Sequence, residues 1–231
     1  MDILFIGGLN LSLYNNYIGE TVELSISDKK SITGMLIDIG KDIIVIYDGK
    51  NFIYIPKIHI HRINCTTDVE LNIIKPESFP LGIEEYSFSL RKVLKNYKVI
   101  FSEDFITNNQ SIHGYITNIM NYYFILYSPV YKMMLIPMHH LKWLIPYQEN
   151  ERPYSLSNQE LPLVPIQTSL ARTFTEQCKK YEEKLVIIDL GMDVNKIGQL
   201  VRMDNSQIQL TIGRNKTVFL NVHHIKTLHL P

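Results

Sequence analysis

The sequence predicts a mainly β protein made of three tandem small barrels, each with about five bent antiparallel strands. Two observations predict this fold class: the composition favours strands over helices, and one pattern of strands recurs three times along the chain. The 231 residues include 33 Ile and 14 Tyr but a single Ala, and β-branched and aromatic side chains suit a pleated, half-buried surface. A hydrophobic share of 45% beside 20% charged residues is typical of a globular chain and excludes a disordered or collagen-like one.

The recurring pattern has two landmarks, a glycine early in an alternating apolar strand and a histidine 25 or 26 residues later. The pairs are Gly34 and His59, Gly114 and His140, and Gly198 and His224. A second apolar strand lies between the two landmarks in every copy. Because the glycines recur every 80 to 84 residues, the repeat is too long for a solenoid and suits a small barrel with its linker.

These intervals divide the chain into three barrels and two linkers. The first barrel covers residues 1–65, the second covers 86–146 and the third covers 169–231, with linkers at 66–85 and 147–168. Both linkers are polar and punctuated by prolines, as is typical of interdomain segments. A domain of about 60 residues buries only about 60% of its unfolded-chain surface, so we expect the barrels to stabilise one another by packing together.

The first repeat illustrates the elements of one barrel. Alternating apolar residues bounded by turn residues predict five strands, at residues 20–27, 31–39, 42–48, 51–57 and 60–64. Helix-like stretches precede the second and third barrels, at residues 86–97 and 170–181. A short helix followed by five bent strands is the plan of the Sm-like, or SH3-like, small barrel. The repeated glycine lacks a Cβ and lets the second strand bend across the core.

Six of the eight histidines fall in the same repeated element, at His59, His61, His139, His140, His223 and His224. Adjacent residues of a strand point to opposite faces, so the His-His pairs are poorly placed to chelate one ion. We expect the repeated histidine to cap the tight turn between the fourth and fifth strands by hydrogen bonding to backbone. The alternative is a metal site, in which His59 and His61 share a face and Cys65 is the nearest further ligand. The structural interpretation is preferred, so no metal and no cofactor are predicted.

Motifs that carry enzymatic chemistry are absent from the sequence. There is no Gly-x-Ser-x-Gly, no His-Glu-x-x-His and no phosphate-binding glycine loop. A catalytic site grafted onto one barrel would also mark that repeat as different, and none of the three differs in this way. We therefore predict a non-enzymatic protein with no catalytic residue and no small-molecule substrate.

The ends of the chain and its cysteines bear on location. Residues 1–6 lack the basic region of a signal peptide, and no run of 18 uncharged apolar residues occurs. The prediction is a protein that is neither secreted by the usual route nor membrane-spanning. Two cysteines in 231 residues, Cys65 and Cys178, are typical of packed thiols in a reducing compartment.

The charge balance bears on nucleic acid as a partner. The chain holds 23 Lys and Arg residues against 23 Asp and Glu residues, so no net positive field gathers phosphates. RNA binding is the alternative function, because some Sm-like barrels bind single-stranded RNA through loops. The corresponding loops here, residues 39–42 and 63–65, lack the residue pattern of that family.

The third repeated element resembles a segment of a known family. Residues 218–228 read Val-Phe-Leu-Asn-Val-His-His-Ile-Lys-Thr-Leu, which is similar to the strand-His-His-Ile-Lys-Ser-Ile segment of spore coat protein B and its relatives in endospore-forming bacteria. That family also has three such units in tandem, so the resemblance covers residues 14–230. It implies a structural component of the spore coat, made in the mother cell cytoplasm and deposited on the forespore. The implied partners are other coat proteins or further copies of the chain.

Strand edges are the expected means of assembly, because unpaired edges of small barrels template further strand pairing. Pro56 and Pro137 each remove a backbone donor from the fourth strand of the first two repeats, whereas Asn221 keeps that donor in the third. We therefore expect the third barrel to offer the assembly edge, at Phe219, Asn221 and His223.

Overall fold

The computed structural model describes residues 11–26, 30–65, 73–76, 88–106, 110–149, 151–157, 169–204 and 206–231. The protein is mainly β, as predicted, and the ladders between its strands are antiparallel. The predicted linkers fall largely outside the described residues, at 66–72, 77–85, 150 and 158–168. No helix in the described ranges is both long enough and apolar enough to cross a membrane. The chain separates into two compact units, one of residues 1–96 and 142–146 and the other of residues 97–141 and 147–231.

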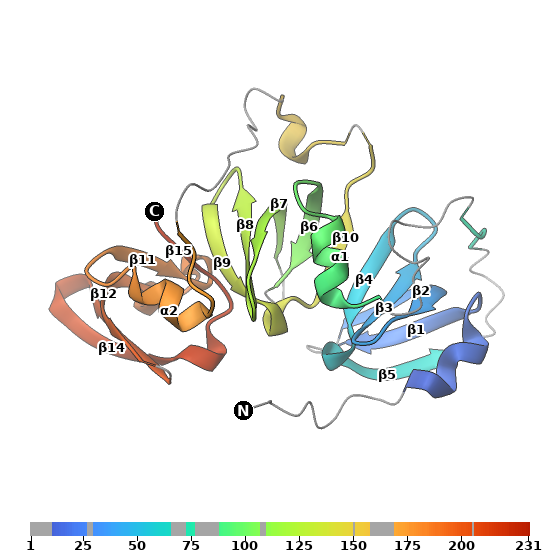
Figure 1. Ribbon diagram of the computed structural model, residues 1–231, viewed down its shortest axis with the longest axis horizontal. Coiled ribbons are helices and arrows are strands. Elements are labelled where there is room, and N and C mark those ends of the chain that lie inside the picture. Colours follow the sequence, from blue (N-terminus) through green and yellow to red (C-terminus); the bar gives the residue numbers. More distant parts are fainter. Residues whose placement is uncertain are drawn as a thin grey trace. The chain divides into compact units, whose positions relative to one another are not determined.

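The first compact unit contains the strands of the first repeat. They are β1 (Thr21–Ile26), β2 (Lys30–Ile39), β3 (Ile43–Tyr47), β4 (Phe52–Pro56) and β5 (Ile60–Cys65). Each begins and ends within one residue of the predicted range. The first four form a meander and β5 returns to pair with β1 (Figure 1). A sixth strand, β10 (Trp143–Pro146), pairs with β4 through Leu144 and Tyr54. The fourth strand of the first repeat is thus covered by the fifth strand of the second.

The second compact unit holds the remaining strands. They are β6 (Phe101–Phe105), β7 (Ser111–Ile119), β8 (Tyr123–Ser128), β9 (Lys132–Pro137), β11 (Leu185–Ile188), β12 (Ile197–Met203), β13 (Gln207–Ile212), β14 (Lys216–Asn221) and β15 (Leu228–His229). Their order is β14-β13-β12-β11-β15-β9-β8-β7-β6 (Figure 1). The fifth strand of the third repeat, β15, therefore lies between its own first strand and the fourth strand of the second repeat.

Helical elements are short. The α-helices are α1 (Leu90–Asn96) and α2 (Phe174–Lys179), and the 3-10 turns are η1 (Leu11–Tyr17), η2 (Lys57–His59), η3 (Met138–His140), η4 (Pro153–Ser155), η5 (Asp189–Gly191), η6 (Val194–Lys196), η7 (Gly213–Asn215) and η8 (Val222–His224). Thr173 and Glu176 form a reciprocal capping box at the start of α2. The start of α1 is held by the first compact unit, because the Leu90 N–H donates to the Asp42 carboxylate at 2.7 Å.

The repeated glycines lie where two backbones approach closely. A Cβ on Gly34 or Gly198 would stand 2.6 Å from the carbonyl oxygen of Tyr47 or Thr211, and one on Gly114 would meet the carbonyl oxygen of Tyr127. Three residues further along each strand the register to the next strand shifts by one residue, which is a β-bulge that increases local bending. The same backbone geometry therefore recurs in all three copies.

One carboxyl group in the described core, that of Asp104, has only part of its hydrogen-bonding capacity satisfied. Asp104 on β6 is fully buried, and one oxygen of its carboxyl group accepts a hydrogen bond from the Ser102 hydroxyl at 2.9 Å. The other oxygen has no hydrogen-bond partner among the described residues. Burial raises the pKa of Asp104 to about 7, because the charged form loses its hydration.

Gly114→Ala should lower the free energy of unfolding by about 1–3 kcal/mol, the range for overpacking against backbone that cannot move aside. Gly213→Ala is the control, because a Cβ there has no heavy atom within 4 Å. Denaturant unfolding of both variants measures the difference. Equal stability of the two variants would contradict the close approach of the two backbones.

Asp104→Asn should change how stability depends on pH. In the wild type the folded state holds a proton that the unfolded chain releases, so stability falls as pH rises from about 4 to about 7 and is constant above. The variant has no carboxyl group to titrate, so its stability should not decrease in this way. Relative to the wild type, the variant should gain about 2–4 kcal/mol in free energy of unfolding between pH 4 and pH 8. Urea unfolding across this range tests it, with the neighbouring Glu103→Gln as control. A wild-type stability that does not decrease between pH 4 and pH 7 would refute the assignment.

Candidate assembly edge

The edge predicted at the third repeat is formed by β14, with η8 directly after it. Among the described strands, β14 pairs with β13 alone, in a register that places Phe219 opposite Gln209 and Asn221 opposite Gln207. Phe219 and Asn221 are therefore on the edge strand itself, and His223 lies in η8. We call Lys216–Asn221 the β14 edge.

Alternation along β14 places Phe219 on the outer side of the sheet. Val218 and Leu220 are partly buried and pack against the apolar cluster of the second compact unit, whereas Thr217, Phe219 and Asn221 are exposed. Successive side chains of a strand point to opposite faces, which explains this division. The Phe219 ring remains 62% exposed.

The equivalent positions in the other repeats are buried. Tyr54 and Leu135 each lie two residues before the proline that ends the fourth strand, as Phe219 lies two residues before Asn221. Tyr54 is 1% exposed and Leu135 is 2% exposed. Leu144 on β10 faces Tyr54, and Leu228 on β15 faces Leu135. Phe219 has no such strand beside it within the described residues.

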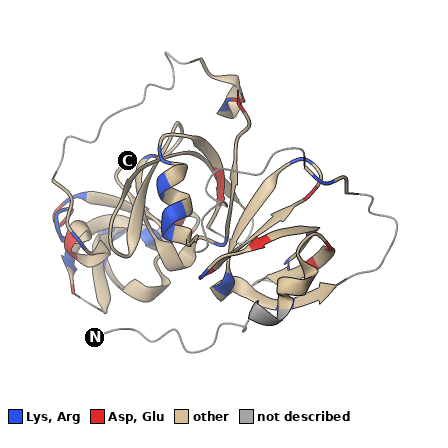
Figure 2. Cartoon of the chain, turned by 45° about the vertical axis from the view of Figure 1, so that its right-hand side comes forward, with Lys and Arg blue, Asp and Glu red and all other residues tan. Residues whose placement is uncertain are grey.

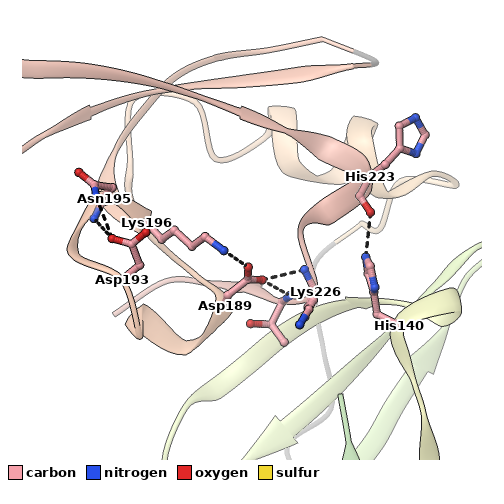
Figure 3. Close-up of polar contacts among 8 residues, drawn as sticks. His140, Asp189, Asp193, Asn195, Lys196, His223 and Lys226 are labelled. Atoms are coloured by element: carbon pink, nitrogen blue, oxygen red, sulfur yellow. Dashed lines mark hydrogen bonds and ion pairs between the residues drawn. The ribbon is translucent and has the colours of Figure 1, made fainter. Parts of the chain in front are cut away.

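The turn after each fourth strand carries the repeated histidine. His59, His140 and His224 are the last residues of η2, η3 and η8. The His140 Nε2–H donates to the carbonyl oxygen of His223 at 3.0 Å, and Figure 3 shows the His223 ring pointing away from this contact. The described hydrogen bond of His140 is therefore made to backbone, in the turn of the following repeat. In η8 itself Asn221 acts as the cap, because its Oδ1 accepts from the His223 N–H at 2.9 Å.

The electrostatic environment of His140 keeps its ring neutral. Loss of hydration, followed by repulsion from the neighbouring His139, lowers the pKa of His140 to about 4. The two rings are close, with centroids 4.0 Å apart. A neutral imidazole can still donate from Nε2 while it places no charge on the contact between the two turns.

An aspartate that the sequence reasoning missed fixes the segment between η8 and β15. Asp189 is buried at the end of β11, and its Oδ1 accepts from the N–H groups of Lys226 at 2.7 Å and Thr227 at 3.1 Å. Its Oδ2 forms an ion pair with the Lys196 ammonium group (Figure 3). The sequence signal was a single acid directly after the apolar run of residues 185–188.

Among the described residues, the charged and thiol side chains form no further candidate site. Within the described part of the chain no group of three or more His, Cys, Asp or Glu side chains could hold a metal ion. Figure 2 shows Lys and Arg residues together with Asp and Glu residues over much of the chain, whereas α1 carries basic residues without acidic ones. Both thiols are free, but only Cys178 is buried, whereas Cys65 is exposed at the end of β5. The expectation that both thiols are packed is therefore wrong for Cys65, because the outer side of β5 is not covered by another described strand.

The fold and the β14 edge place the protein among mainly β proteins with internal repeats, with an exposed edge strand in the third repeat. Residues 173–228 match the family model described as YwrJ third domain. The chain is 42% identical over 221 residues to the uncharacterized protein YwrJ of Bacillus subtilis (strain 168), an alignment that covers 94% of this chain and 98% of that protein. The chain belongs to the YwrJ family. The resemblance to spore coat protein B stays a prediction.

His140→Gln should weaken the loss of stability in acid. The pKa of His140 is near 4 in the folded state and near 6.5 in the unfolded chain, so the unfolded state binds the proton first and stability falls as pH decreases from about 6.5 to about 4. Because the ring is partly exposed, the effect is small. Between pH 6.5 and pH 4 we expect the free energy of unfolding of the variant to fall by about 1 kcal/mol less than that of the wild type.

Chemical denaturation at pH 7 and at pH 4.5 measures this difference. A glutamine amide can still donate to the His223 carbonyl, so the two proteins should be similar at pH 7. The exposed His61→Gln is the matched control and should follow the wild type. An unchanged acid sensitivity in His140→Gln would contradict the environment described for this ring.

Proposed function

We propose that the protein is a non-enzymatic structural component of the bacterial spore coat that acts by protein–protein assembly through the β14 edge. The observation that carries the proposal is the exposure of Phe219, whose counterparts Tyr54 and Leu135 are buried beneath a neighbouring strand. An apolar ring on a strand that has one strand partner among the described residues favours addition of a further strand. The resemblance of residues 218–228 to spore coat protein B suggests that this assembly takes place in the spore coat.

We infer that the chain is organised as three tandem small barrels of the Sm-like or SH3-like kind. Three recurring features support this architecture. Each repeat has five strands, a glycine at a close backbone approach before a bulge, and a 3-10 turn between its fourth and fifth strands. The helices α1 and α2 precede the second and third repeats, in agreement with that plan. In this architecture the fifth strand of one barrel also lines the fourth strand of the barrel before it.

A structural function agrees with the parts played by the recurring residues. Gly34, Gly114 and Gly198 permit backbones to approach, and His140 donates to a backbone carbonyl. These are architectural roles, and the proposal therefore includes no reaction. The chain has 23 Lys and Arg residues and 23 Asp and Glu residues, so no net positive charge favours RNA.

The proposal is tested in the organism that makes the protein. We expect expression confined to sporulation, extraction with the coat fraction, and loss of coat retention by several-fold in Phe219→Asp. Tyr122→Asp is the control, because Tyr122 is 70% exposed and lies between β7 and β8, outside the β14 edge. Equal amounts in vegetative cells, or exclusion from the coat, would overturn the proposal. So would tight binding to oligoribonucleotides that weakens steeply with salt.

A further inference from the structure

We propose that the protein assembles head to tail with copies of itself, with β5 of one copy pairing antiparallel with β14 of the next. The inference rests on the proposed function, because it names the partner of the same edge. Among the described strands β5 pairs with β1 alone and β14 pairs with β13 alone (Figure 1). Each copy therefore presents two different strand edges, one from its first repeat and one from its third.

The chain contains two precedents for this junction. β10 pairs with β4, and β15 pairs with β9, both antiparallel. In each case the fifth strand of one repeat lines the fourth strand of the repeat before it. Among the described strands only two members of this series lack a partner from another repeat, namely β14, the fourth strand of the third repeat, and β5, the fifth strand of the first. A second copy supplies the missing partner to each.

The precedents fix the register of the junction. Leu144 faces Tyr54, and Leu228 faces Leu135; the residue of β5 at the position of Leu144 and Leu228 is Ile63. The junction therefore places Ile63 opposite Phe219, so that a half-buried aliphatic side chain and an exposed ring cover each other. Such cross-strand apolar pairs stabilise a sheet.

The flanking pairs of this register are also compatible. Arg62 comes to lie opposite Leu220, and Cys65 comes to lie opposite Thr217. No two like charges directly face each other, which would destabilise an antiparallel pair.

A second contact follows from the histidine turns. His140 at the end of η3 donates to the carbonyl oxygen of His223 in η8, the turn of the following repeat. His224 is the counterpart of His140 in the third repeat, and Ile58 is the counterpart of His223 in the first. The same contact across the junction would therefore place the exposed His224 imidazole against the carbonyl oxygen of Ile58 in a second copy. Ile58 is itself exposed in η2. The junction thus combines strand pairing with a histidine contact of a kind already present within the chain.

The strength of the junction is limited by polar residues beside Phe219. Tyr123 and Ile125 on β8 are buried in the cluster shared with the third repeat, and the corresponding residues on β13 are Gln207 and Gln209. Glutamine side chains at these positions offer less apolar area to a second strand than tyrosine and isoleucine would. We therefore expect reversible association that increases with concentration. Because the two edges differ, the contact is heterologous and builds rings or open chains.

Sedimentation velocity of the full-length protein tests the proposal, from about 10 μM to about 1 mM, the range of weak reversible contacts. We expect the average mass of the wild type to increase through dimers and larger species. Phe219→Asp and Ile63→Asp should each weaken association about tenfold or more, because a carboxylate would be buried at the junction. Tyr122→Asp should associate like the wild type.

A mixture of the two edge variants identifies the geometry. Phe219→Asp retains a normal β5 and Ile63→Asp retains a normal β14 edge, so an equal mixture should form a heterodimer and nothing larger. An isologous dimer between two β14 edges would instead persist in Ile63→Asp alone and would overturn the head-to-tail arrangement. Circular dichroism verifies that each variant is folded. If Ile63→Asp is not folded, Cys65→Asp at the exposed end of β5 replaces it.

A wild type that remains monomeric at the highest concentration would refute self-assembly. The proposed function has its own readout, which is coat retention of Phe219→Asp in cells. Loss of retention together with a monomeric wild type would show that the β14 edge binds a different coat protein. Unchanged retention together with concentration-dependent association would support the self-assembly inference and show that the β14 edge does not hold the protein in the coat.

Discussion

The pairing of strand edges is the constraint on which the described structure depends. A small sheet leaves backbone donors and acceptors open at both margins, and these groups need partners wherever water is excluded. In this chain β10 covers β4 and β15 covers β9, so the margin of one repeat is completed by a strand that belongs to the next. The apolar residues Tyr54 and Leu135 are buried as a consequence. Among the described strands β14 pairs with β13 alone, so its outer margin is not completed in this way.

A second constraint acts inside each repeat. The second and third strands approach so closely at the repeated glycine that a Cβ would meet a carbonyl oxygen of the opposite strand. The bulge that follows changes the register and bends the strand further. Side chains around these positions differ between the copies, yet the backbone path is retained. The repeat is therefore preserved as a backbone geometry more than as a set of side chains.

Local features of the fold could be predicted from the sequence, because they depend on neighbouring residues. Apolar alternation located the strands of the first repeat, and the glycine and histidine spacing located the recurring turns. The pairing of β10 with β4 could not be predicted in this way, since it joins residues about 90 positions apart through backbone groups that every sequence has. The buried acids Asp104 and Asp189 were missed for a related reason. Their burial is set by distant strands, and a lone acid is usually found on a solvated surface.

The position of β10 has a consequence for the order of events during synthesis. The first compact unit includes residues 142–146, so it lacks one of its strands until the whole second repeat has left the ribosome. Until then one edge of β4, which has the apolar sequence Phe-Ile-Tyr-Ile-Pro, lacks the pairing that β10 later provides. Transiently unpaired margins of this kind are where misassembly between chains begins. Completion of the first compact unit therefore depends on residues that are synthesised only after most of its own sequence.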